Sequence, residues 1–143
     1  MKISSKGEYG LRALFDLTQH YKQRPRRSRE IAEAQNIAED YLNQLLITLR
    51  RAELINSLRG PQGGHELARD PRQITLYDAL RVLEGEISFT DYAANMEPAP
   101  VDDVLNPVWQ IIVQETIRIL QETTLENLRE RRESQEQELM YHI

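Results

Sequence analysis

The stretch that decides the fold is Asn36-Ile37-Ala38-Glu39-Asp40-Tyr41-Leu42-Asn43-Gln44-Leu45-Leu46-Ile47-Thr48-Leu49-Arg50-Arg51. Its leucines at positions 42, 45, 46 and 49 follow the i, i+3, i+4, i+7 spacing that places side chains on one face of a helix. The pattern predicts a helix from about Ala38 to Ala52 with that face buried. The opposite face is polar and is left for solvent or for a partner.

Upstream of this helix, the sequence predicts two more helices. Ser4 or Ser5 can cap a first helix that runs to about Lys22, and Pro25 prevents it from continuing. Ser28 is then expected to cap a short helix from Arg29 to about Gln35. Asn36 tolerates the left-handed conformation of a tight turn, with Ile37 packed beneath it.

Downstream, the apolar period changes. Leu54–Arg59 and His65–Ala68 are short enough to be strands, and the glycine-rich segment Gly60–Gly64 between them predicts a hairpin. Thr75 is expected to start a further helix, Leu76 to Glu84, which Gly85 ends.

The second half of the chain predicts a loop, a long helix and a tail. Residues 86–103 carry loop signals, and Pro107 suits a helix start with Asn106 as its cap. The helix should run to about Glu122, followed by one or two turns over residues 124–128 and a charged tail. Its apolar stripe is wider than a small domain needs and predicts a dimer contact through Trp109, Ile112, Val113, Thr116, Ile119 and Leu120.

The expected fold is therefore mostly α with a small β-hairpin wing. Residues 1–85 form a winged helix-turn-helix head, and residues 86–143 form a loop, a dimerisation helix and a tail. Residues 1–72 hold 13 Lys and Arg against 9 Asp and Glu, whereas residues 73–143 hold 5 against 14. A basic first half joined to an acidic second half suits a head that meets a polyanion.

Composition excludes several classes of protein. The chain has no cysteine, so disulfides, thiolate nucleophiles and cysteine-ligated metal or iron–sulfur sites are excluded. His20, His65 and His142 are far apart in sequence, and no metal site is expected. No apolar run approaches the roughly 18 residues of a membrane span, and the N-terminus lacks a secretory signal, so we expect a cytoplasmic protein without membrane contact.

The polar face of the central helix predicts contacts with duplex DNA. Asn and Gln can hydrogen-bond adenine in the major groove, arginines can neutralise phosphates, and glycines let a hairpin backbone approach DNA closely. Each feature alone is also typical of a solvated helix or a plain hairpin; their order within one basic half favours DNA. The expected DNA-binding residues are Lys6, Ser28, Arg29, Asp40, Tyr41, Asn43, Gln44, Arg50, Arg51, Arg59, Gly60, Gly63 and Gly64.

The sequence also resembles a known family, the Rrf-type transcription regulators, which include IscR, NsrR and CymR. The resemblance covers nearly the whole chain and is carried by Met1–Gly10, Tyr41–Leu46, Leu58–Gly64 and Leu83–Gly85. It implies a DNA-binding regulator, in most cases a repressor, that acts as a homodimer on a palindromic operator. The recognition helix would be about Ala38–Ala52 and the wing Arg59–Gly64.

Two departures from the family pattern matter. Asn43 stands where many relatives have a glutamate that helps to set base preference, so an operator sequence cannot be transferred. The relatives that bind an iron–sulfur cluster carry three cysteines in the loop equivalent to residues 86–106, and this chain has none. We therefore expect no cofactor, and the signal must act in another way.

The sequence is most similar to the cluster-free CymR-like branch, a likeness that extends to Glu138–Ile143. In that branch the regulator forms a complex with O-acetylserine sulfhydrylase, which implies a role in cysteine or sulfur metabolism. An apolar side chain beside a terminal carboxylate could dock on such a partner. We therefore treat Tyr141, His142 and Ile143 as a candidate partner tail, against the alternative that the tail frays or packs on the dimer.

Three other functions stay open at this stage. A small effector could bind near residues 86–106 or at the dimer interface around Trp109, with the same DNA-binding head. The winged helix could instead serve a protein partner without touching DNA. An enzyme is disfavoured because the adjacent pair Asp102-Asp103 lacks a nucleophile, a phosphate loop or a metal set.

Overall fold

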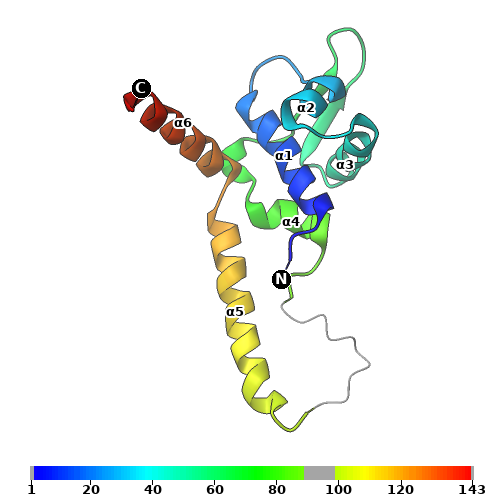
Figure 1. Cartoon of the computed structure of the whole chain (residues 1–143). Helices are drawn as coiled ribbons and strands as arrows, with labels where there is room; N and C mark the ends of the chain where they lie inside the picture. The colour runs from blue at the N-terminus through cyan, green and yellow to red at the C-terminus, as the bar shows by residue number, and fades with distance from the viewer. Residues whose placement is uncertain (1, 89–98, 143) are drawn as a thin grey trace.

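A computed structural model describes residues 2–88 and 99–142 of the chain. A helical head carries a two-stranded hairpin at one end, and a long helix projects away from it (Figure 1). The elements are α1 (Ser5–Gln19), α2 (Ser28–Gln35), α3 (Glu39–Arg51), β1 (Ile55–Leu58), β2 (Gly64–Leu67), the 3-10 helix η1 (Pro71–Gln73), α4 (Leu76–Glu84), α5 (Asp102–Glu122) and α6 (Leu125–Tyr141). The expected fold class, mostly α with a small β-hairpin wing, is confirmed.

The core of the head lies where α1, α3 and α4 meet, with α2 packed on α1 and α3. All four leucines of the α3 stripe are buried, as predicted. They contact Leu14 and Leu17 of α1 and Ile31 of α2 in one cluster. Each buried leucine contributes about 1.5–3 kcal/mol, so this cluster fixes which face of α3 points outward.

The first helix is shorter than the sequence predicts. Ser4 caps it by accepting from the Gly7 N–H at 3.3 Å, as expected. It ends at Gln19 rather than near Lys22, because Lys22 adopts a left-handed conformation with φ 63°. The Tyr21 and Gln23 N–H groups close two short turns there instead.

The turn between α2 and α3 is as predicted, but the start of α2 is not. Asn36 is left-handed, with φ 55° and ψ 53°, and Ile37 is buried under it. The prediction that Ser28 caps α2 is wrong: the helix begins at Ser28 itself, after Arg27. The Glu30 carboxylate accepts from the Arg27 N–H at 3.0 Å, which releases the Ser28 hydroxyl for another contact.

The hairpin is an antiparallel pair in which Ile55 faces Leu67 and Leu58 faces Gly64. Its turn spans residues 59–63, one residue earlier than expected. Gly60 has φ 100°, a conformation that residues with a Cβ atom rarely adopt. The first strand is shorter than predicted by one residue at each end, whereas the second keeps its predicted length of four residues but begins one residue earlier, at Gly64.

The prediction that the long helix starts at Pro107 is wrong. Helix α5 begins at Asp102, and Pro107 lies inside it. The Val104 and Leu105 N–H groups both donate to the Val101 carbonyl at 3.0 Å, which forms the first turn upstream of the proline. Pro107 is the sixth residue of α5 and lies just past the first turn, so the helix lacks one backbone hydrogen bond there and must accommodate the proline ring.

The predicted charged tail is a helix of 17 residues, α6. Thr124 caps it by accepting from the Asn127 N–H at 3.1 Å. Ion pairs at i, i+3 and i, i+4 spacing follow its surface, and Arg129 pairs with both Glu126 and Glu133. Such pairs add a few tenths of a kcal/mol each and, with no glycine or proline from residue 125 onward, favour a helix.

A short backbone junction ties the end of α5 to the head. The Leu76 N–H donates to the Thr123 carbonyl at 2.8 Å, and the Leu125 N–H donates to the Ile74 carbonyl at 2.9 Å. The Leu125 side chain is fully buried in the head's core. Residues 123–125 therefore fold with the head although they follow the long helix.

Candidate nucleic-acid interface

The outward face of α3 is open and polar. Asp40, Asn43 and Gln44 are exposed in its first turns, opposite the buried leucines. Tyr41 is half-buried because its ring packs edge-on against Tyr9 of α1, with 5.8 Å between the ring centroids. The helix therefore presents hydrogen-bonding side chains near its N-terminal end, in the manner of a recognition helix.

One residue on this face was not expected from the sequence. Ile47 is a large apolar side chain, yet 41% of it is exposed. It lies four residues after Asn43 and three after Gln44, so the three share one face of α3. An apolar group among base-reading residues is suited to the methyl group of thymine. The spacing of the buried leucines could have placed Ile47 on this face, because position 47 does not fall on their side of the helix.

The basic side chains of the predicted interface are open to solvent. Lys6, Arg50, Arg51 and Arg59 are exposed. Arg29 is exposed too, and its guanidinium lies 3.3 Å from the Glu33 carboxylate. An exposed pair of this kind is weak and leaves the arginine able to bind phosphate.

Other arginines of the basic half hold the fold together instead. Arg26 Nε donates to Asp16 at 2.9 Å, and the Asp16 carboxylate is only 1% exposed. Arg24 donates to Glu30 at 2.7 Å and lowers the pKa of Glu30 to about 2, helped by the Arg27 N–H. Arg26 therefore joins α1 to the segment before α2, and Arg24 joins that segment to α2.

The wing glycines have different physical roles. A Cβ on Gly63 would lie 2.2 Å from the Leu58 carbonyl oxygen, and one on Gly64 would lie 2.6 Å from the Arg26 carbonyl oxygen. Both glycines are therefore required by the chain's own packing. Gly60 has no atom within 4 Å of the corresponding point, so its backbone faces open space beside Arg59.

A notch of about 250 Å³ separates α3 from the wing. Ser28, Asn43, Ile47, Arg50 and His65 line it, together with Leu46 and Ser57. The notch thus brings predicted DNA-binding residues of α2 and α3 next to the base of the hairpin. No carboxylate lines it among the residues that the structure describes.

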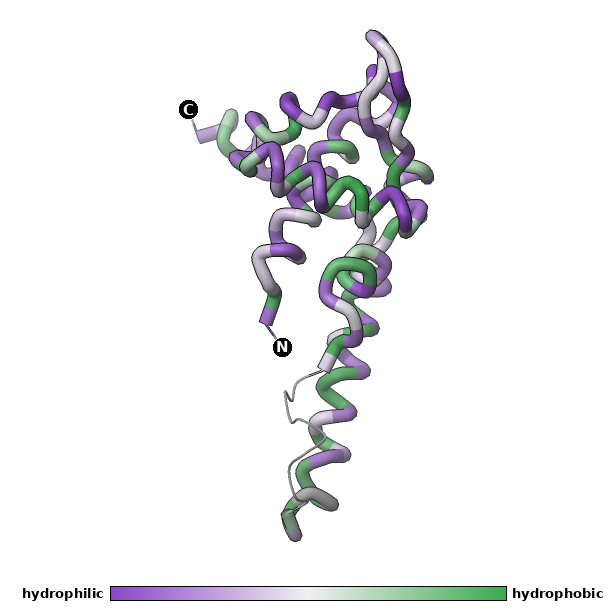
Figure 2. Tube along the Cα trace, turned by 90° about the vertical axis from the view of Figure 1, so that its right-hand side faces the viewer, coloured by the Kyte–Doolittle hydropathy of each residue, from purple (hydrophilic) through white to green (hydrophobic). Residues whose placement is uncertain are grey.

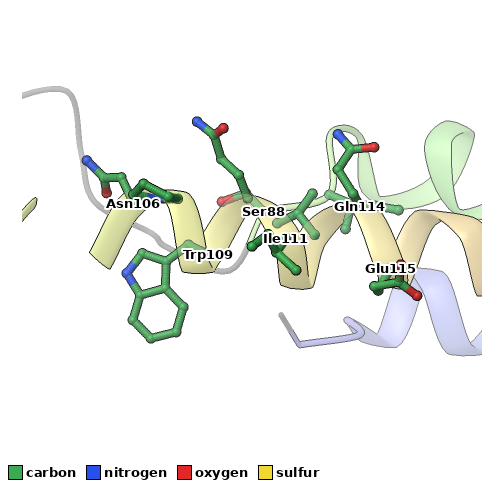
Figure 3. A pocket seen from close by; sticks show the side chains of 10 residues that line it. Ser88, Asn106, Trp109, Ile111, Gln114 and Glu115 are labelled. Atoms are coloured by element: carbon green, nitrogen blue, oxygen red, sulfur yellow. The ribbon is translucent and has the colours of Figure 1, made fainter. Parts of the chain in front are cut away.

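The expected dimerisation residues lie on α5, away from the head. Trp109, Ile112, Val113, Thr116 and Leu120 are half-buried, and Ile119 is exposed. Further apolar side chains on α5 are open to solvent, and Ile111 is 63% exposed. Figure 2 shows apolar residues along much of this helix, and Figure 3 shows Trp109 projecting from it. Trp109 lines an open hollow of about 730 Å³.

The remaining predicted sites are only partly described. Tyr141, the last residue of α6, is 90% exposed, and His142 is exposed too; Ile143 lies outside the described residues. The effector loop at residues 86–106 has its central part, residues 89–98, outside them as well. Within residues 2–88 and 99–142, no group of three metal-ligating side chains gathers, and no helix has the length and apolarity to cross a membrane.

Comparison with known proteins agrees with this geometry. The family model Rrf2, described as an iron-dependent transcriptional regulator, matches residues 3–131. The HTH-type transcriptional regulator CymR of Bacillus subtilis is 37% identical over 143 residues, all of both chains.

Two solved structures share both the fold and substantial sequence identity. The structure of CymR, named the global cysteine regulator of B. subtilis, has a TM-score of 0.77 at 38% identity, over 90% of this chain and 95% of that one. T. potens IscR has a TM-score of 0.74 at 40% identity, over 91% of this chain and 87% of that one. The chain belongs to the Rrf2 family and is a winged helix-turn-helix DNA-binding transcriptional regulator.

Proposed function

We propose that this regulator binds a palindromic operator as a homodimer and represses genes of cysteine or sulfur metabolism. One observation supports the DNA-binding mode: the polar face of α3 is exposed, with the wing beside it and Arg50 lining the notch between them. The physiological role rests on the similarity to CymR over the whole chain.

The proposed interface divides into reading and anchoring groups. Asn43, Gln44 and Ile47 would contact base edges in the major groove. Arg59 and the Gly60 backbone would enter the neighbouring minor groove or meet its phosphates. The residues proposed to anchor the DNA backbone are Lys6, Ser28, Arg29, Asp40, Tyr41, Arg50 and Arg51. Among them, Asp40 and Tyr41 would act by orienting neighbouring side chains.

The proposed division of labour follows the two parts of the chain. Residues 1–85 would form the head that contacts one half-site, while residues 86–143 would join two heads through the apolar side of α5. Leu125 returns to the head's core, so the second part also supports the first. Two heads related by a two-fold axis require two half-sites about one helical turn, roughly 34 Å, or a multiple apart.

Genome-wide mapping of bound sites, followed by titration of the recovered operator at several salt concentrations, tests the proposal. We expect a palindrome near genes of sulfur metabolism and a log–log salt slope of about one unit per phosphate contacted. Binding that depends on neither the salt concentration nor the DNA sequence would instead indicate that the winged helix binds a protein partner.

We also propose that the C-terminal end of α6 docks on O-acetylserine sulfhydrylase, through the tail Tyr141, His142 and Ile143. The high exposure of Tyr141 supports an accessible tail. Pulldown of the enzyme with the full chain, compared with a chain lacking the last four residues, tests this. Equal capture by both chains, or by neither, would contradict the docking.

A small effector is the second candidate signal. The open hollow beside Trp109 on α5 favours this region over the head. Tryptophan fluorescence titrated with sulfur metabolites should then change, because Trp109 is the chain's single tryptophan. A flat titration would leave protein–protein control as the proposed signal.

A further inference from the structure

His65 connects more parts of the head than any expected DNA-binding residue. It lies in β2, the returning strand of the wing. Its Nδ1 is 2.8 Å from the Ser57 hydroxyl on β1, and its Nε2 is 3.0 Å from the Ser28 hydroxyl at the start of α2. One ring therefore spans from the hairpin to the helix-turn-helix.

The His65 backbone makes the same connection a second time. Its N–H donates to the Arg26 carbonyl at 2.7 Å, and its carbonyl accepts from the Arg26 N–H at 2.8 Å. Nearby, Arg27 Nη2 donates to the Pro61 carbonyl at 2.5 Å. The segment just before α2 thus joins the wing through one isolated antiparallel β-bridge, between Arg26 and His65.

The ring also forms part of the wall of the notch that faces α3, which it shares with Asn43, Ile47 and Arg50. Burial, with a smaller contribution from the Arg50 charge, lowers the pKa of His65 below its ordinary value. At neutral pH the ring is therefore uncharged, with one nitrogen donating and the other accepting. Because a serine hydroxyl can either donate or accept, both hydrogen bonds can form in a single tautomer of the ring.

We propose that His65 is a positioning residue that sets where the wing lies relative to the recognition helix. It acts through Arg59 at the tip rather than by touching a base. Because this inference rests on the proposed DNA contact of the wing, it concerns how that contact is aimed. The physical reason is that Arg59 reaches the groove only if the hairpin is held at one angle to α3. If the hairpin is held less firmly, the Arg59 side chain samples other positions and contacts the DNA less often.

The test is a double-mutant cycle on operator affinity. His65→Phe keeps a ring in the wall but removes both hydrogen bonds, and we expect a loss of about threefold to thirtyfold, the effect of one or two neutral hydrogen bonds. The same substitution should cost little when Arg59 is already alanine, because there is then no tip side chain to aim. His65→Gln, which keeps one donor and one acceptor, should restore part of the affinity.

Matched variants separate placement from general stability. Ser57→Ala removes one bond of the pair at a residue with no proposed DNA contact and should give part of the loss. His20→Gln replaces a histidine just after α1, whose ring contacts the Asp16 carbonyl oxygen and lies 3.7 Å from the Asp16 carboxylate, and should leave operator affinity unchanged. Melting temperatures of all variants show whether affinity follows folding.

The outcomes distinguish this inference from the proposed function. If the wild-type chain does not bind the operator, the proposed function is wrong. If Arg59→Ala weakens binding but its effect adds fully to that of His65→Phe, the wing binds DNA and only the positioning role is overturned. A loss in His65→Phe that His65→Gln does not restore would also overturn it.

Discussion

At the scale of single residues, the interface depends on which side chains the core leaves outside. The buried leucines of α3 turn Asn43, Gln44 and Ile47 toward solvent. These three side chains offer different chemistry: two can exchange paired hydrogen bonds with a base, and one can meet only an apolar group. Each therefore predicts a different kind of loss when it is removed.

Replacing Asn43 or Gln44 with alanine should weaken binding selectively at one base pair. The expected cost is about 1–3 kcal/mol against the preferred base, and binding to other sequences should change little. Titration against operators with single base changes measures this. A uniform loss across all sequences would mean that the side chain contacts the backbone instead.

Replacing Ile47 with alanine should remove sensitivity to a thymine methyl group. In the wild-type chain, deoxyuridine in place of one operator thymine should weaken binding, because the methyl group loses its apolar contact. In Ile47→Ala the same replacement should have no effect. If no thymine position behaves in this way, Ile47 does not read the groove.

The pKa of Glu30, lowered to about 2 by Arg24 and the Arg27 N–H, predicts an acid-sensitive contact between α2 and the segment before it. The carboxylate stabilises the folded state above its ordinary pKa of 4.5, and this contribution is lost as the pH falls toward 2. Glu30→Gln should flatten the fall in the free energy of unfolding over that range, as followed by urea titration. Asp70→Asn, which removes the separate pair with Arg72, should flatten it independently.

At the scale of elements, the wing is a short hairpin held by the segment before α2. Arg59→Ala should weaken binding to every sequence and reduce the salt slope by about one, because it removes one phosphate or groove contact. Arg131→Ala on α6 makes the same charge change away from the proposed interface and should leave the slope unchanged. If affinity is unaltered in Arg59→Ala, the wing does not contact DNA.

Strong local patterns allowed most elements of the head to be predicted. The leucine spacing predicted α3, Asn36 predicted the turn before it, and Thr75 with Gly85 predicted both ends of α4. The starts of α2 and α5 were missed because capping there depends on Glu30 and on backbone bonds upstream of Pro107. Helix α6 could have been found from its regularly spaced Arg and Glu residues and its lack of helix breakers.

The site was less predictable than the fold. Arg26 and Arg59 look alike in sequence, yet one binds a buried aspartate and the other faces solvent. Burial and long-range partners separate them, and neither is encoded locally. The structural role of His65 could not be predicted for the same reason: its partner Ser28 lies 37 positions away in the chain.

At the scale of the whole molecule, the apolar side of α5 predicts a dimer that can be broken without unfolding the head. Ile111→Glu places a charge on a side chain that is 63% exposed in the single chain, so folding should be unaffected. In a dimer the charge would be desolvated, and we expect monomers by sedimentation and weak binding to a full operator. Gln110→Glu, at an exposed polar position beside it, is the matched control; dimers in both variants would exclude this face.

The backbone junction between Ile74 and Leu125 has a consequence for how the regulator would measure its target. Two backbone hydrogen bonds and the buried Leu125 attach the C-terminal end of α5 to the head, which restricts rotation of α5 relative to the head. In a symmetric dimer, the distance between the two copies of α3 would then be fixed by the protein and would not adjust to the DNA. Operators whose halves are moved apart by one or two base pairs should consequently be rejected, even when every base in each half is correct.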